Sequence, residues 1–184
     1  NRDEFVTWLQ ELSAHASNGV VPGILGPDLV LVDHEAQKKT PRLAWMFPGQ
    51  GAQRVGLLRG LYERSAQFKE TLDSLAQAVE SILPKPLLTY LYPELDGTKE
   101  SLEAAEDALK ATQVCQPTMA ALGLALGQFL ESLGIDAEIT LGHSLGEFVA
   151  AASGGILSES QTLQFVAKRG KLMAELELND FGAM

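Results

Sequence analysis

Hydrophobic residues along the chain form short runs separated by longer stretches with helical spacing. Three short apolar runs, over residues 29–32, 43–46 and 138–141, predict buried β-strands. The clearest helical pattern covers residues 72–83, where apolar residues recur at intervals of three and four until Pro84 stops the pattern. Strands that alternate with helices predict an α/β core with a mainly parallel sheet.

Weaker patterns predict further helices on both sides of that stretch. They cover residues 3–16, 101–110, 117–133 and 148–154. The third is expected to begin at Pro117, because proline suits the first turn of a helix. Arg169 also lies in a segment with helical spacing, whereas residues 84–97 read as a turn-rich insert.

The composition indicates a globular domain and excludes two classes of partner. The 184 residues can bury a sizeable core, and 46% of them are apolar. A formal net charge of −10 argues against a nucleic-acid surface, which needs clustered Lys and Arg. No apolar run reaches the ~18 residues of a transmembrane helix. We expect a soluble domain that binds neither nucleic acid nor a membrane.

Cys115 is the only cysteine of the chain, so it cannot form an internal disulfide. A single thiol is compatible with a reducing compartment, and we expect the domain to be cytoplasmic. The residues around it are apolar, which predicts that Cys115 is a small buried hydrophobe.

The segment Gly142-His143-Ser144-Leu145-Gly146 has the G-x-S-x-G pattern of a nucleophile elbow. It follows a predicted strand and precedes a predicted helix, and the sharp turn needs glycine on both sides. Such a turn exposes the serine hydroxyl at a helix N-terminus, where N–H groups favour developing negative charge. We therefore predict that Ser144 is an acyl-transfer nucleophile and that the Leu145 N–H forms one arm of its oxyanion hole.

Two further segments support a site around Ser144. Residues 47–53 read F-P-G-Q-G-A-Q after the predicted strand at 43–46, so they form a loop whose backbone N–H groups can turn toward a ligand. Arg169 provides a fixed positive charge on a predicted helix, and a guanidinium is the natural bidentate partner of a free carboxylate.

Together these residues resemble the acyltransferase family that loads carboxyacyl groups onto carrier proteins. Its members are malonyl-CoA:acyl-carrier-protein transacylases and the acyltransferase domains of polyketide and fatty-acid synthases. The resemblance runs from about Pro41 to Met184 and rests on four ordered motifs. These are F-P-G-Q-G-A-Q, Gln116-Pro117 opening an apolar helix, G-H-S-L-G-E and R-G-K-L-M. Leu145 at the fourth position of G-H-S-L-G-E resembles malonyl-selective domains.

The resemblance also implies a fold and a domain organisation. Residues 1–40 look like the linker that precedes the acyltransferase in modular synthases, and residues 41–184 like the N-terminal part of its large subdomain. That subdomain would be a three-layer, α/β-hydrolase-like core with a mainly parallel sheet. A small ferredoxin-like subdomain would follow a segment such as residues 180–184 and is expected to be missing here.

For the site, the resemblance implies that the backbone N–H of Gln50 forms the second arm of the oxyanion hole and that Arg169 binds the distal carboxylate of malonyl. Gln116 is a weaker pocket candidate. Met173 can equally belong to the core, and Glu147 is expected to cap or brace the elbow. The catalytic histidine of the family comes well after the serine, so it is expected beyond Met184.

None of the three histidines in the chain is expected to be the base. His143 lies next to Ser144, where consecutive side chains diverge, so a structural role is favoured. His15 and His34 lie in the linker-like region and are expected to be solvated.

The implied reaction is a ping-pong transfer from acyl-CoA to the phosphopantetheine thiol of an acyl carrier protein. We expect no bound metal or redox cofactor, because a thioester is already activated. The expected partners are acyl-CoA, the carrier protein, the remainder of the acyltransferase domain and a neighbouring ketosynthase. Two alternatives stay open at this point. One is a serine hydrolase or esterase, which shares the elbow, and the other is a non-catalytic docking module of a synthase.

Overall fold

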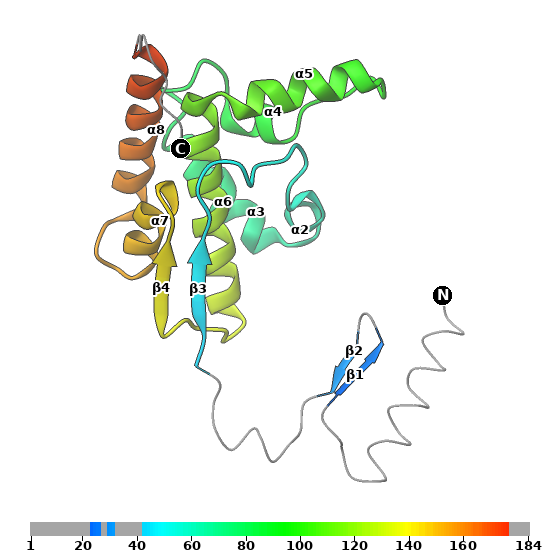
Figure 1. Cartoon of the computed structure of the whole chain (residues 1–184), viewed down its shortest axis with the longest axis vertical. Helices are drawn as coiled ribbons and strands as arrows, with labels where there is room; N and C mark the ends of the chain where they lie inside the picture. The colour runs from blue at the N-terminus through cyan, green and yellow to red at the C-terminus, as the bar shows by residue number, and fades with distance from the viewer. Residues whose placement is uncertain (1–22, 27–28, 32–41, 177–184) are drawn as a thin grey trace. The chain divides into compact units, whose positions relative to one another are not determined.

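A computed structural model gives the fold of residues 23–26, 29–31 and 42–176 (Figure 1). The chain divides into two compact units, residues 1–42 and 43–184, and each is described by itself. In the first unit, β1 (Gly23–Gly26) pairs antiparallel with β2 (Leu29–Leu31), which confirms the predicted strand there. The predicted helix over residues 3–16 lies outside the described residues, as do His15, His34 and residues 180–184.

The second unit contains the predicted parallel pair of strands, but the expectation that both strands are buried is wrong, because one face of the pair is exposed. β3 (Ala44–Phe47) pairs with β4 (Ile139–Gly142), with Ala44 opposite Ile139 and Phe47 opposite Gly142. In this register the two strands end side by side. The loop after β3 and the turn after β4 therefore begin at the same edge of the sheet, which is where parallel α/β sheets hold their ligands.

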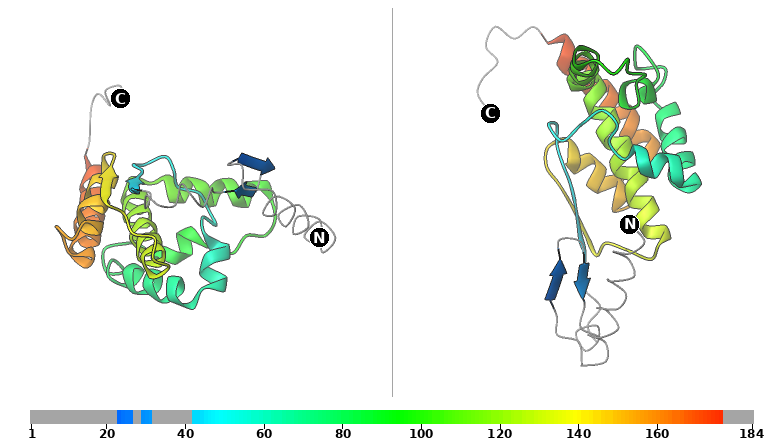
Figure 2. Two further views of the ribbon diagram at one scale, coloured as in Figure 1. Left: turned by 90° about the horizontal axis from the view of Figure 1, so that it is seen from below. Right: turned by 90° about the vertical axis from the view of Figure 1, so that its right-hand side faces the viewer.

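The two faces of this sheet differ in what covers them (Figure 2). Trp45 and Phe47 pack on α6 (Thr112–Ser132), where glycines admit their rings: a Cβ at Gly127 would lie 3.0 Å from the Trp45 ring, and one at Gly123 would lie 3.2 Å from the Phe47 ring. The opposite face is apolar and open to solvent, with exposed fractions of 79% for Met46, 49% for Ile139 and 49% for Leu141.

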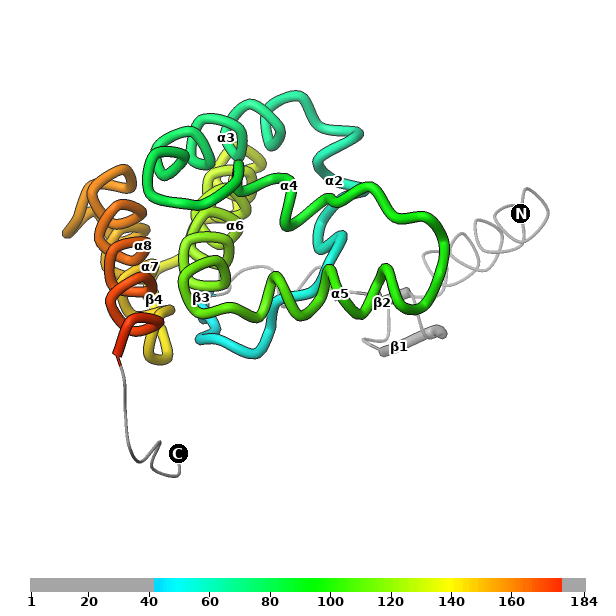
Figure 3. The backbone as a smooth tube through the Cα atoms, turned by 90° about the horizontal axis from the view of Figure 1, so that it is seen from above, coloured from blue at the N-terminus to red at the C-terminus, as the bar shows by residue number. Residues whose placement is uncertain are grey.

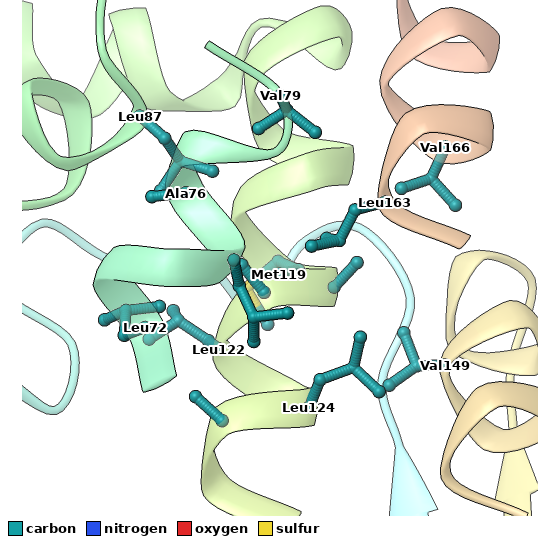
Figure 4. Close-up of a cluster of buried hydrophobic side chains, with 14 of the residues drawn as sticks. Leu72, Ala76, Val79, Leu87, Met119, Leu122, Leu124, Val149, Leu163 and Val166 are labelled. Carbon is teal, nitrogen blue, oxygen red and sulfur yellow. The ribbon is translucent and has the colours of Figure 1, made fainter. Parts of the chain in front are cut away.

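Helix α6 is the centre of the second unit. It packs against α3 (Ala66–Gln77) and α8 (Glu159–Glu175), which Figure 3 shows around it, and against α7 (Leu145–Ser153). Apolar side chains from all four helices meet in one core (Figure 4). The largest fully buried ones include Phe68, Leu72, Leu124, Leu145, Val149 and Leu163. This core fixes the starts of α6 and α7 relative to α8.

The described helices confirm some sequence boundaries and correct others. α5 (Lys99–Lys110), capped by the Thr98 hydroxyl, matches the predicted acidic helix. The predicted helix over residues 72–83 is wrong at both ends. α3 starts at Ala66 behind the Ser65 hydroxyl, which accepts from the Phe68 N–H, and it ends at Gln77. Val79 and Leu83 are still buried, but Val79 lies in a turn and Leu83 in a bend, so the helical spacing of these residues indicated burial and not a helix.

Two short helices were not predicted. α2 (Arg59–Arg64) follows the loop after β3, and α4 (Leu87–Leu91) lies inside the predicted turn-rich insert. Both are too short to show a helical period in the sequence. Leu87 and Leu91 of α4 are fully buried, so tertiary packing holds this helix in place.

The prediction that the apolar helix begins at Pro117 is also wrong. α6 begins at Thr112, and Pro117 lies inside it. Proline removes only one intrahelical bond, to the Gln113 carbonyl. The additional turn buries Val114 and Cys115, which outweighs that loss.

The described residues of the second unit thus form an α/β fold with a two-stranded parallel sheet and helices against one face. The three-layer, hydrolase-like arrangement and the small ferredoxin-like subdomain stay predictions. Among the described helices, none combines the length and apolar character needed to cross a membrane.

Candidate functional site

Ser144 lies at the tight turn between β4 and α7, which is the strand–turn–helix context that the sequence predicts. Its backbone has φ 52° and ψ −108°, a conformation that residues other than glycine rarely adopt. The side chain belongs to an exposed residue. A strained serine at the end of a strand is the geometry of a nucleophile elbow.

The flanking glycines are required by close backbone contacts. A Cβ at Gly142 would overlap the backbone of Gly146 and Glu147, which lie across the turn. A Cβ at Gly146 would overlap the carbonyl oxygen of Phe47, at the end of the neighbouring strand. The prediction that glycine is needed on both sides of the turn is therefore confirmed by the geometry.

The same turn is pressed against the loop that follows β3. The His143 N–H donates to the Phe47 carbonyl at 3.1 Å. A Cβ at Gly49 would lie 2.9 Å from His143 Nδ1, so the imidazole lies against the Gly49 backbone. The loop at 47–53 and the elbow, far apart in the sequence, thus form one surface at the carboxyl ends of the two strands.

This arrangement places the two predicted oxyanion arms on neighbouring segments. Leu145 is the first residue of α7, where N–H groups have no partner within the helix. Gln50 lies in the turn after Pro48, and the next N–H, of Gly51, is donated to Gln53 Oε1 at 2.7 Å. The oxyanion role of Leu145 and Gln50 stays a prediction.

Glu147 braces the elbow, as expected from the sequence. Its Oε1 accepts a hydrogen bond from the Ser144 N–H at 3.0 Å. The carboxylate also lies in the first turn of α7, where the helix dipole favours a negative charge. Glu147 is therefore engaged with the backbone of the turn that it stabilises.

Three predicted site residues meet at the start of α6. Arg169 Nη1 donates to Gln116 Oε1 at 2.7 Å, and Gln116 Nε2 lies 3.4 Å from Gln50 Oε1 and 3.3 Å from Met173 Sδ. Gln116 is completely buried, so each of its polar atoms must find a partner inside the protein. A residue that was the weaker pocket candidate connects the Gln50 loop to the arginine.

Arg169 is half-buried on α8, and the two side chains that its guanidinium contacts, those of Gln116 and Phe148, are uncharged. Besides Gln116, its guanidinium lies 5.8 Å from the centroid of the Phe148 ring, a cation–π distance. In the described part of the chain, no carboxylate forms an ion pair with it. A guanidinium with only neutral partners keeps donors available for an anionic ligand.

Gly170 explains how Arg169 reaches Gln116. A Cβ at position 170 would lie 2.7 Å from the Thr112 carbonyl oxygen and 3.1 Å from the Gln113 Cα. The missing side chain lets α8 cross the first turn of α6 at close range. Arg169, one residue earlier, is thereby held against α6.

Sequence reasoning missed Thr112 and Phe148. The Thr112 hydroxyl lies 2.6 Å from Gln50 Nε2, at the helix start that the sequence analysis placed too late. The Phe148 ring packs against Phe165 of α8, with the ring centroids 4.9 Å apart and the planes tilted by 44°, and it also contacts the Arg169 guanidinium. The glycine directly after Arg169 was the one local signal of close helix packing. Cys115 is fully buried, as predicted.

Comparisons with known proteins agree with this geometry. The family model described as the acyl transferase domain matches residues 44–184. A PKS-NRPS hybrid synthetase of Aspergillus niger is 38% identical over 138 residues, which are 75% of this chain and 7% of the synthetase. The chain thus spans a small part of that relative.

Two solved structures share the fold. The acyl transferase domain of ZmaA superposes with a TM-score of 0.67 at 33% identity, covering 75% of this chain and 31% of that structure. The malonyl CoA-acyl carrier protein transacylase FabD of Coxiella burnetii gives a TM-score of 0.57 at 30% identity, covering 73% of this chain and 38% of that structure.

Proposed function

This chain belongs to the acyl transferase domain family, and on that premise we propose that it contributes the nucleophile and the acyl-binding side of a malonyl-type acyltransferase. The acyl group moves from coenzyme A to the phosphopantetheine thiol of an acyl carrier protein. The Coxiella relative, whose name specifies malonyl CoA and acyl carrier protein, supports this choice of donor and acceptor.

In the first half-reaction Ser144 Oγ attacks the thioester carbonyl. An ester bond forms to Ser144, the carbon–sulfur bond breaks, and coenzyme A leaves as the thiol with the proton taken from the serine. In the second half, the phosphopantetheine thiol attacks the ester carbonyl: a carbon–sulfur bond forms, the bond between the carbonyl carbon and Ser144 Oγ breaks, and the serine oxygen regains the proton lost by the thiol. The N–H groups of Leu145 and Gln50 stabilise the oxyanion of each tetrahedral intermediate.

One observation supports the malonyl-type substrate most strongly: Arg169 is held beside Gln116 with neutral partners only, among the described residues. A guanidinium in that setting pairs with the free carboxylate of a carboxyacyl group through two parallel hydrogen bonds. The thioester needs no metal or redox cofactor for this transfer, so only substrates and a carrier protein are required.

The base that activates Ser144 is proposed to be a histidine in the remainder of the domain, downstream of Met184. His143 lies against Gly49, on the loop side of the elbow, which suits a structural role. The solved relatives extend well beyond the matched part, since this chain covers 31% and 38% of them. In a synthase, a ketosynthase is the proposed neighbour.

The test uses the complete acyltransferase domain, meaning this chain joined to the remainder of its domain. The domain is incubated with malonyl-CoA and a carrier protein bearing phosphopantetheine, and malonyl-carrier protein and free malonate are both measured. We expect malonyl-carrier protein as the main product. Free malonate as the main product would indicate a hydrolase, and carrier binding without transfer would indicate a docking module.

A further inference from the structure

One face of the first turn of α6 anchors the loop that carries Gln50. Thr112, Cys115 and Gln116 are spaced three and four residues apart, so they lie on the same side of the helix. Thr112 and Gln116 both contact the Gln50 amide, and Cys115 Sγ lies 3.2 Å from Gln53 Oε1. The loop is thus attached to α6 at both Gln50 and Gln53.

The charge of Arg169 fixes the direction of the hydrogen bonds that run from Arg169 through Gln116 and Gln50 to Thr112. A guanidinium only donates, so Gln116 must present Oε1 to Arg169 and its Nε2 to Gln50. Gln50 must then present Oε1 to Gln116, which leaves its Nε2 pointing at the Thr112 hydroxyl, 2.6 Å away. Among the three hydrogen bonds that link Arg169 to Thr112, the one that the Thr112 oxygen accepts is the last and the shortest.

We propose that Thr112 is a positioning residue for acyl transfer: its hydroxyl holds the Gln50 amide, and through it the Gln50 loop, against the start of α6. The proposal rests on the proposed function, in which the Gln50 N–H stabilises the oxyanion. Such a donor is effective only when it is pre-positioned for the transition state. Thr112 therefore acts on catalysis through the loop and does not contact the acyl group.

Three variants of the complete domain test this. Thr112→Val removes the acceptor and keeps the β-branched shape, whereas Thr112→Ser keeps the hydroxyl. Losing one such hydrogen bond predicts that Thr112→Val lowers kcat by about 5- to 30-fold. The KM of Thr112→Val for malonyl-CoA should stay within about twofold of the wild-type value. The kcat of Thr112→Ser should also stay within about twofold of the wild-type value. Thr118→Val is the matched control. Thr118 is buried in α6, and its hydroxyl donates to the Val114 carbonyl at 2.7 Å, away from the loop.

A comparison of malonyl and acetyl transfer distinguishes the role of Thr112 from that of Arg169. Because the oxyanion forms with every acyl group, Thr112→Val should reduce malonyl and acetyl transfer by the same factor.

A double-mutant cycle adds a second criterion. If Thr112→Val and Gln50→Met remove the same interaction, the double variant should be no slower than the slower single variant. Unchanged kcat in Thr112→Val, equal losses in the Ser and Val variants, or multiplying losses in the cycle would overturn the proposal.

A measurement without turnover keeps this proposal distinct from the proposed function. Hydrogen–deuterium exchange of the peptide over residues 47–58 should be faster in Thr112→Val than in the wild type and unchanged in Thr118→Val. Exchange that is the same in all three proteins would contradict the role of Thr112. Absence of malonyl transfer in the wild type, with faster exchange in Thr112→Val, would instead contradict the proposed function alone.

Discussion

Gly146 meets the carbonyl of Phe47 so closely that a Cβ on residue 146 would overlap the Phe47 oxygen. This relationship joins the elbow that carries Ser144 to the loop that carries Gln50. Because residue 146 is a glycine without a Cβ, Ser144 and the predicted oxyanion donor, the Gln50 N–H, can lie on adjacent segments. This arrangement also depends on the parallel register that places Phe47 opposite Gly142.

Gly146→Ala should both destabilise and inactivate the complete domain. The new methyl group can be accommodated only by separating α7 from β3, which predicts a loss of about 2–4 kcal/mol in the free energy of unfolding. Urea denaturation measures it. Gly60→Ala is the control, because its Cβ meets only the movable end of Arg64 and alanine favours the helix. Equal stability of the two variants would show that the contact is not tight.

Arg169→Ala should change which acyl group is transferred. Loss of a charged hydrogen bond from a partly desolvated site costs on the order of 2 to 4 kcal/mol. Malonyl transfer should therefore fall by roughly 30- to 1000-fold, while acetyl transfer falls far less or rises. Competing malonyl- and acetyl-CoA donors measure the ratio, and Lys168→Ala, at an exposed neighbouring position, is the control. Equal losses for both donors would assign Arg169 a structural role.

The sequence predicted the elements that carry strong local signals. The two strands of the second unit were predicted one residue too early, and their expected burial is wrong for Met46, Ile139 and Leu141. The glycine-flanked turn at Ser144 matches the structure, because backbone sterics at such a turn leave few alternatives. Helix ends were less predictable. The buried positions after Gln77 kept the helical spacing although the chain had left the helix, and Pro117 was compatible with a helix that starts earlier.

The connections within the site could not be predicted from spacing. Thr112 and Gln50 are brought together by packing of α6 beside the sheet, and no local pattern marks a threonine as a partner of a distant loop. Arg169 and Gln116 meet only because Gly170 lets two helices touch. The resemblance suggested both residues for the site, and the structure adds the hydrogen bond between them.

Cys115 should be unreactive toward thiol reagents in the folded domain. Burial raises the pKa of its thiol, which lowers the thiolate fraction at neutral pH, and the side chain is inaccessible. Labelling by DTNB at pH 8 should be at least about tenfold slower in the native protein than in 6 M urea. Equal rates in the two conditions would mean that the start of α6 opens readily.

The chain of residues 1–184 alone should be only marginally folded and nearly inactive. The open sheet face exposes Met46, Ile139 and Leu141, an apolar surface of the kind that other protein segments normally cover. We expect strong binding of the dye ANS, which decreases when the chain is extended with the remainder of its domain.

The residual turnover of residues 1–184 alone should be several orders of magnitude lower than that of the complete domain. Comparable turnover would place the base within this chain and make His143 the first residue to mutate.

Intact mass spectrometry shows directly whether Ser144 forms the acyl-enzyme. After brief incubation of the complete domain with malonyl-CoA, without carrier protein, we predict one malonyl adduct that a peptide map assigns to Ser144. Ser144→Ala should carry no adduct, whereas Ser153→Ala, at the far end of α7, should be acylated like the wild type. An adduct that persists in Ser144→Ala would show that another residue is the nucleophile.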